Sequence, residues 1–239
     1  MRLDKYLAEA AQCTRSESRE AIRSGRVSVN GAVCKRPEQQ VSEMDSIQLD
    51  GKSRPRQAFV YIMLNKPAGV VSASSDRRDT TVVDLVRSAY PRRELFPAGR
   101  LDKTSTGFVL ITDDGGFAHD ILAPRRHVPK TYRVTLDTPL TGEMVEGFAA
   151  GVVLMDNVRL APAEVEPLSE DKRTVRVVLH QGVYHQIKRM FGVYGAGVNA
   201  LHREAIGPVR LDPALAPGEW RPLTAAELAA LRAAAQTPR

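Results

Sequence analysis

The chain has 239 residues, of which 43% are hydrophobic and 26% are charged, and its formal net charge is +6. This composition is ordinary for a globular protein with a substantial core, and the sequence has no apolar stretch long enough to cross a bilayer. The positive charge is compatible with a polyanionic partner but does not require one.

The N-terminal residues and the cysteines bear on where the protein works. The sequence begins MRLDK and lacks the apolar core of an export signal. The two cysteines, Cys13 and Cys34, form no CxxC pair and suit a reducing compartment. We therefore expect a cytoplasmic protein.

Residues 1–50 have the pattern of two helices followed by a hairpin. Leucines recur at helical spacing near the N-terminus, and Thr14 with Glu17 has the pattern of a capping box that opens a second helix, which Gly25 can end. An Asn-Gly pair at positions 30–31, between alternating apolar residues, indicates a β-hairpin. The pattern predicts a small N-terminal domain.

The second predicted helix carries arginines at every fourth position. Arg15, Arg19 and Arg23 share one helix face, where like charges at this spacing repel one another. A solvated basic face is one interpretation. A surface that faces RNA phosphates is the other.

The remaining chain predicts a linker and a larger second domain. Residues 51–58 are polar, basic and contain proline, which is typical of a linker, and the second domain is predicted to span residues 59–239. Its strand and helix patterns lack strict β-α-β alternation, so the expected fold class is α+β, with a mixed, largely antiparallel sheet flanked by helices. A strand that ends in a turn is predicted at 59–69, further strands at 108–112, 130–136 and 174–180, and helices at 81–90, 116–123, 142–152, 185–195 and 228–235.

The stretch PAGRLDKTSTGFVLITDDGG, residues 97–116, contains three carboxylates in two settings. Asp102 stands alone before an apolar run, and Asp113 and Asp114 follow that run. An aspartate at such a place more often binds the backbone of its own turn than reacts, so the local sequence leaves both interpretations of Asp102 open. The acidic pair, followed by two glycines, is typical of a turn.

Two segments resemble nucleotide-binding motifs but lack the necessary context. Residues 195–200 match G-x-G-x-x-A yet follow a predicted helix, and residues 99–104 lack the glycine directly before the lysine of a phosphate-binding loop. We therefore expect no nucleotide cofactor. We also expect no metal, because no metal-site spacing occurs among the five histidines, which are His119, His127, His180, His185 and His202.

Three polar segments follow the N-terminal domain in order: LNKPAG at 64–69, GRLDKTSTG at 99–107 and HQIKRMF at 185–191. Behind a unit similar to an S4 RNA-binding domain, they resemble the three motifs of the bacterial ribosomal pseudouridine synthases, over nearly the whole chain. The segments TDDG, PRRHVPKTY and LHREAIG most resemble the branch that acts on small-subunit (16S) rRNA; the branch that acts on large-subunit (23S) rRNA is the alternative. Val183 stands where close relatives have arginine.

The resemblance implies a reaction and the residues that carry it. The N1–C1′ bond of a uridine breaks, the base turns, and C5 joins C1′, without a cofactor. Asp102 would be the catalytic carboxylate, by attack on C1′ or by assisting removal of a sugar proton, and Tyr132 would stack on the uracil. Lys188 would pair with Asp102, with Arg189 as the alternative partner. The implied substrate- and RNA-binding residues are Arg100, Arg189, Lys66, Arg15, Arg19 and Arg23.

The implied partner is rRNA within partly assembled small subunits, and the protein is expected to be a monomer. Two other functions stay open. A non-catalytic RNA-binding or ribosome-assembly protein would need only the S4-like domain. A nucleoside hydrolase would need a second carboxylate roughly 5–10 Å from Asp102, for which Asp113 is the nearest candidate in sequence.

Overall fold

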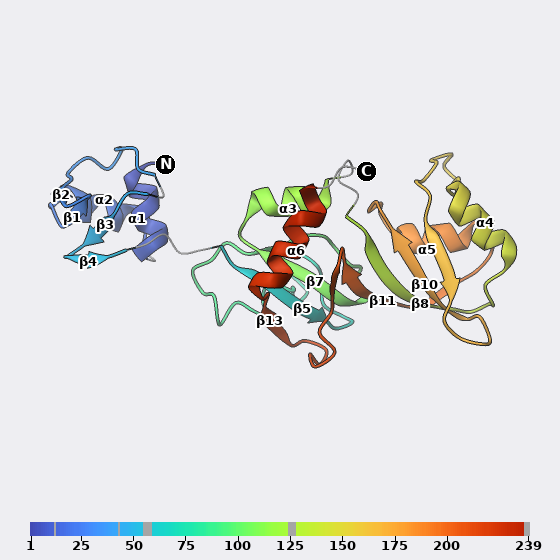
Figure 1. Ribbon diagram of the computed structural model, residues 1–239. Helices are drawn as coiled ribbons and strands as arrows, with labels where there is room; N and C mark the ends of the chain where they lie inside the picture. The colour runs from blue at the N-terminus through green and yellow to red at the C-terminus, as the bar shows by residue number, and fades with distance from the viewer. Residues whose placement is uncertain (12, 43, 55–58, 124–127, 237–239) are drawn as a thin grey trace. The chain divides into compact units, whose positions relative to one another are not determined.

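The computed structural model describes residues 1–11, 13–42, 44–54, 59–123 and 128–236. The chain divides into two compact units, Met1–Phe59 and Val60–Arg239 (Figure 1). None of the described helices is both long and apolar enough to span a membrane.

The N-terminal unit packs two helices against a small sheet with the strand order β2-β1-β3-β4, in which all neighbouring strands are antiparallel. Its core contains Leu3, Leu7 and Ile22 from the helices and Val27 from the sheet, all fully buried. The elements are α1 (Leu3–Ala11), α2 (Arg15–Arg23), β1 (Val27–Val29), β2 (Ala32–Val33), β3 (Ile47–Leu49) and β4 (Lys52–Ser53).

Local signals in the sequence account for these elements. The Glu17 N–H donates to Thr14 Oγ1 at 3.2 Å, and the Thr14 N–H donates to the Glu17 carboxylate at 2.7 Å, which confirms the capping box. Asn30 and Gly31 have positive φ angles of 54° and 83°, the backbone that a tight two-residue hairpin turn requires, and this confirms the hairpin.

The predicted linker at residues 51–58 is wrong at its beginning. Lys52 pairs with Leu49 in the register of β3 and β4, and the Tyr6 hydroxyl donates to the Arg54 carbonyl at 3.2 Å. The reason is the Asp50-Gly51 pair, which forms a second tight turn with φ angles of 53° and 73°. Residues 55–58 lie outside the described part of the chain.

The larger unit is built on a nine-stranded sheet with the order β13-β5-β7-β11-β8-β10-β9, to which β12 adds beside β11 and β6 beside β7. All pairs are antiparallel except β7 with β11, which are parallel, so the expected α+β class with a mixed sheet is confirmed. The strands are β5 (Tyr61–Lys66), β6 (Phe96–Pro97), β7 (Thr106–Thr112), β8 (Lys130–Leu136), β9 (Glu164–Pro167), β10 (Thr174–Leu179), β11 (Val198–Ile206), β12 (Val209–Arg210) and β13 (Trp220–Pro222), and the helices are α3 (Gly115–Leu122), α4 (Gly142–Ala150), α5 (Gln186–Gly192) and α6 (Ala225–Gln236).

Both faces of the sheet are covered, because successive strand residues point to opposite sides. Ile62 and Leu64 belong to one buried cluster together with residues of α4 and α5, whereas Met63 belongs to a second cluster with residues of α3 and α6. Figure 1 shows α3 and α6 over the half of the sheet with β5 and β7, and α4 and α5 over the half with β8 and β10.

Two predicted helices differ from the structure. Residues 82–89 form successive turns with i→i+3 bonds, such as Val86 N–H to Val83 O at 3.1 Å, and no α-helix. Their buried β-branched valines favour side-chain packing over helix continuation. Helix α5 ends at Gly192, three residues before the predicted stop at Gly195.

Strands β7 and β11 approach most closely at Gly107. Its φ is 102°, and a β-carbon added there would lie 2.7 Å from the backbone nitrogen of Arg203 and in contact with the Arg203 carbonyl oxygen. Only glycine combines this φ with this lack of side-chain volume. The parallel pairing of His202 with Thr106 and of Arg203 with Gly107 therefore depends on Gly107.

We predict that Gly107→Ala lowers the free energy of unfolding by at least about 3 kcal/mol, because it adds backbone strain to a clash with the neighbouring strand. Gly115→Ala is the matched control, since an added β-carbon there meets nothing within 4 Å and its backbone is not in the positive-φ region. Denaturant unfolding of the two variants measures the difference; equal stability would contradict the tight approach.

Candidate active site

Asp102 lies in the turn that leads into β7. The Ser105 N–H donates to the Asp102 carbonyl at 3.0 Å and closes the turn. The Asp102 side chain, which is 29% exposed, faces α5: Lys188 Nζ lies 3.2 Å from Oδ2, and His185 Nε2 lies 3.3 Å from Oδ1. The Asp102 carboxylate therefore contacts side chains from a distant part of the chain. A capping aspartate would instead bind the backbone of its own turn.

The start of α5 supplies both of these partners. His185 is the residue before the helix and has the left-handed backbone angles φ 49° and ψ 34°, and its ring makes no capping bond to the helix. Lys188 follows three residues later, within the helix, and its Nζ also lies 3.3 Å from Thr104 Oγ1. The turn and the helix are thus joined through three side-chain contacts.

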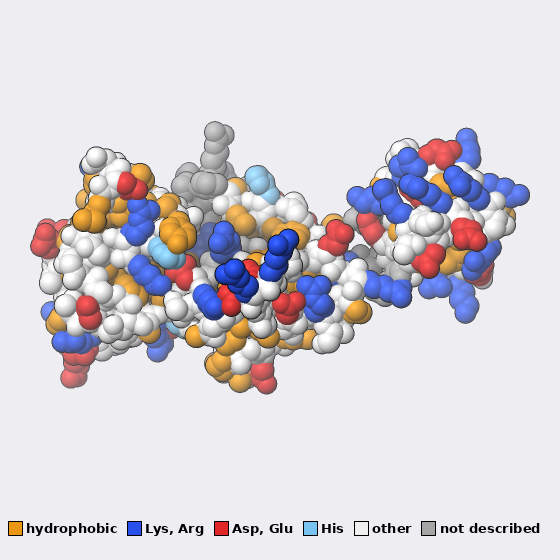
Figure 2. Space-filling view, turned by 180° about the vertical axis from the view of Figure 1, so that it is seen from behind, with side chains coloured by type: hydrophobic (Ala, Val, Ile, Leu, Met, Phe, Trp, Pro, Cys, Tyr) orange, Lys and Arg blue, Asp and Glu red, His pale blue; other side chains and the backbone are white. Residues whose placement is uncertain are grey.

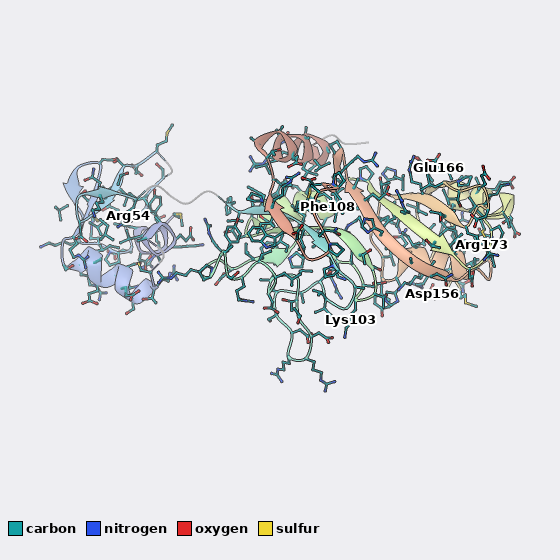
Figure 3. All side chains as sticks on the ribbon, turned by 90° about the horizontal axis from the view of Figure 1, so that it is seen from below. Arg54, Lys103, Phe108, Asp156, Glu166 and Arg173 are labelled. Carbon is teal, nitrogen blue, oxygen red and sulfur yellow. The ribbon has the colours of Figure 1, made fainter. Side chains whose placement is uncertain are left out.

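The structure distinguishes the two candidate cations of α5. Lys188 contacts Asp102, whereas Arg189 Nη2 lies 2.6 Å from Asp156 Oδ2 in the loop after α4 (Asp156 is labelled in Figure 3). Adjacent helix residues point about 100° apart, so both cannot serve the same carboxylate.

Tyr132 lies in β8 and is 9% exposed. It belongs to the buried cluster that also contains Leu101 and Ile187, the residues directly before Asp102 and Lys188. Its strand neighbours in register are Val177 and Arg203. The three segments that carry the predicted catalytic residues therefore pack into one core.

Lys66 corrects a prediction. It was expected to bind RNA, but it is fully buried and its Nζ donates to the carbonyl oxygens of Pro67, Lys103 and Ser105 at 3.0, 3.3 and 2.7 Å. Burial lowers the pKa of Lys66 to about 8, although the nearby Asp102 charge acts in the opposite direction. Lys66 is a support beneath the Asp102 turn; Lys103, in the same turn, is labelled in Figure 3.

Comparison with known proteins identifies the family. Residues 60–192 match the model of the RNA pseudouridylate synthases, and residues 1–47 match the model of the S4 domain. The chain belongs to the RNA pseudouridylate synthase family.

Relatives of the synthase match it almost from end to end. It is 42% identical over 229 residues to the ribosomal small subunit pseudouridine synthase A of Vibrio vulnificus, covering 95% of this chain and 98% of the relative. It is 40% identical over 233 residues to the protein of the same name in Escherichia coli, covering 97% and 100%. A crystal structure of a pseudouridylate synthase, 39% identical, superposes with a TM-score of 0.69 and covers 97% of this chain and 99% of the other.

The arginines expected to bind RNA fall into different settings in the synthase. Arg100 is exposed and makes no ion pair or hydrogen bond with the described residues. Arg15 and Arg23 are exposed too, but Arg19 Nε lies 3.0 Å from Asp4 Oδ2. Asp4 is fully buried; desolvation acts to raise its pKa, yet hydrogen bonds from Arg2 and Arg19 outweigh that effect, and its pKa lies below the usual range.

The acidic pair after β7 serves the fold. Asp113 accepts hydrogen bonds from the Val60 N–H and from Arg93, and Asp114 caps α3 by accepting from the Phe117 N–H at 3.0 Å. The seven-residue strand β7 separates Asp113 from Asp102 by about 20 Å. Asp113 therefore cannot act on the same bond as Asp102, which removes the candidate that a hydrolase would need.

Sequence reasoning missed His185 and Thr104 as neighbours of the carboxylate. A signal for His185 was available, because the helix predicted at 185–195 would place His185 and Lys188, three residues apart, on one face. Thr104 could not be found, because its contact with Lys188 depends on how the turn meets α5. Residues 124–127 of the segment PRRHVPKTY, which include His127, lie outside the described residues.

We predict that Lys66→Met lowers the free energy of unfolding by about 3 kcal/mol, because three carbonyl oxygens, of which that of Ser105 is buried, lose a charged donor. RNA affinity of the remaining folded protein should stay within about twofold. Thermal unfolding and filter binding measure the two quantities. Lys103→Met, which removes an exposed lysine paired with Asp79, is the stability control. Loss of affinity without loss of stability would instead restore Lys66 as an RNA contact.

Proposed function

We propose that this synthase converts one uridine of 16S rRNA to pseudouridine, with Asp102 as the catalytic carboxylate. The observation that carries the proposal is the contact of Asp102 with Lys188 and His185, in a chain that matches small-subunit synthases along nearly its full length.

The chemistry needs little beyond one carboxylate. The N1–C1′ bond breaks with its electron pair on uracil, which delocalises the charge, and C5 then joins C1′ and loses its proton. Attack of Asp102 on C1′ and assisted removal of a sugar proton both use an unprotonated carboxylate held at a fixed place. Lys188 and His185 hold the two oxygens of Asp102, so that the carboxylate is oriented before the substrate arrives.

Three further residues take proposed roles at the same site. Tyr132 stacks on the uracil that has been turned out of the RNA. Arg100, exposed and two residues before Asp102, contacts the backbone of the extruded nucleotide. Arg189 contacts a phosphate by exchanging its ion pair with Asp156.

Electrostatic attraction brings the RNA to both units. In Figure 2 the N-terminal unit presents many lysine and arginine side chains on the face in view, with acidic side chains among them, and basic side chains also gather at the centre of the larger unit. Arg15, Arg19 and Arg23 are all exposed on α2, and Arg15 and Arg23 are the two that form no ion pair with the described residues, so they are the freest to contact phosphates. The proposed substrate is rRNA within partly assembled small subunits in the cytoplasm, bound by a monomer.

We predict that Asp102→Asn abolishes pseudouridine formation while leaving the fold and RNA affinity nearly intact, because it removes the reacting charge and keeps the shape. The loss should exceed about 10²-fold. A strain without the gene, complemented with wild type or with the variant, is compared by pseudouridine mapping of its rRNA.

The map has three informative outcomes. One 16S site that is lost in the deletion strain and restored only by wild type supports the proposal. A lost site in 23S rRNA would move the substrate to the large subunit. Restoration by Asp102→Asn would remove Asp102 from the chemistry.

We predict that replacing Arg15 and Arg23 together by glutamine weakens RNA binding and lowers the slope of log affinity against log salt by roughly 0.7–0.9 for each phosphate that these arginines no longer neutralise. Arg26→Gln is the control, since Arg26 is already paired with Asp50 in the same unit. Titrations at several salt concentrations give the slopes. An unchanged slope in the double variant would mean that the arginines form a solvated face.

A further inference from the structure

The loop before α5 carries an exposed aromatic ring beside the catalytic carboxylate. Tyr184 is 72% exposed, and its ring stacks on that of His185 with centroids 3.8 Å apart and 17° between the planes. His185 in turn contacts Asp102. The two rings form a stack whose inner member touches Asp102 and whose outer member faces solvent.

The backbone holds this stack in place. The Gln186 N–H donates to the Val183 carbonyl at 3.1 Å, and the Val183 N–H donates back to Gln186 Oε1 at 3.0 Å. Gln186 itself is buried at the start of α5. Tyr184 and His185 lie between these two anchored residues, so the ring is presented by an ordered loop.

Tyr184 has no counterpart among the other tyrosines of the chain. All six lie in the described residues, and Tyr184 alone is exposed. Tyr90 packs against Trp220, for example, and Tyr194 packs against Phe148. The fold therefore uses the other rings in its cores, and the open face of Tyr184 is free for a ligand.

The surroundings favour a flat, uncharged ligand over a phosphate. Val183, next to Tyr184, is 37% exposed and uncharged. Lys188, on the neighbouring helix, is engaged by Asp102 and is not available to a phosphate. An aromatic face beside an apolar side chain suits a nucleobase, because every base offers a π-face for stacking.

We propose that Tyr184 is a stacking platform for a nucleobase next to the target uridine. Extruding the uridine leaves its neighbours without a stacking partner, and the outer ring of the Tyr184–His185 pair takes the place of that partner. The inference rests on the proposed function. It assigns to Tyr184 part of the binding of the sequence around the target, and no part of the bond chemistry.

The test uses synthetic RNA that carries the uridine identified by mapping, with 2-aminopurine on its 5′ or its 3′ side. Wild type should quench the fluorescence at one of these positions, Tyr184→Phe should quench it equally, and Tyr184→Ala should not. The Kd of Tyr184→Ala should rise about 5- to 150-fold, the range that corresponds to loss of one base–aromatic stack. Its single-turnover rate at saturating RNA should change less than about threefold.

Leu168→Ala is the control, because it also removes an exposed apolar side chain, directly after β9, and should bind RNA as wild type does.

Wild-type affinity in Tyr184→Ala, or equal loss of affinity in Tyr184→Phe, would contradict the stacking role of Tyr184. A lower saturating rate with unchanged affinity would also overturn it, since Tyr184 would then act by holding His185. If wild type itself forms no pseudouridine in any rRNA, the proposed function fails instead. If Tyr184→Ala does not fold, Tyr184→Leu, which keeps an apolar side chain and lacks the aromatic ring, takes its place in the same comparison.

Discussion

The backbone path of the turn at residues 102–105 is the constraint on which the site depends. The buried Lys66 amine donates to two carbonyls of this turn, those of Lys103 and Ser105. On the side-chain side of the turn, Lys188 and His185 contact the Asp102 carboxylate. Just before the turn, the Ser72 hydroxyl both donates to and accepts from the backbone of Leu101. A short surface turn would ordinarily sample several conformations, and these contacts restrict it to a single conformation.

Strand β7 connects this turn to the sheet of the larger unit. It pairs with β5 on one side and, in parallel, with β11 on the other, so it joins the two halves of the sheet. Gly107 allows the backbone of β11 to approach, directly after the turn at residues 102–105 ends. The two ends of the strand have different tasks: Asp102 precedes it and faces α5, whereas Asp113 and Asp114 follow it and fix the start of β5 and the cap of α3.

The sequence predicted the features whose signals are local. Capping at Thr14, the Asn30-Gly31 turn and the four predicted strands of the large sheet, which are β5, β7, β8 and β10, are confirmed, because a few neighbouring residues determine each of them. The helix expected at 81–90 was wrong, since the conformation of this segment depends on the packing of its buried valines, which no local pattern encodes. The choice between Lys188 and Arg189 likewise needed the rotation of α5 against the turn, and no local pattern encodes that rotation. The burial of Lys66 is a tertiary fact of the same kind.

The way in which Lys66 binds has a consequence for how this enzyme can vary. Its ammonium group donates to main-chain oxygens, which every amino acid possesses, so these bonds do not depend on the side chains of the residues that carry the oxygens. A mutation that exchanges the Lys103 side chain therefore leaves these bonds in place, as long as the backbone keeps its course, whereas the Thr104 side chain is tied to Lys188. The position of the Asp102 carboxylate is therefore less sensitive to substitutions in its own turn than a network of side chains would make it.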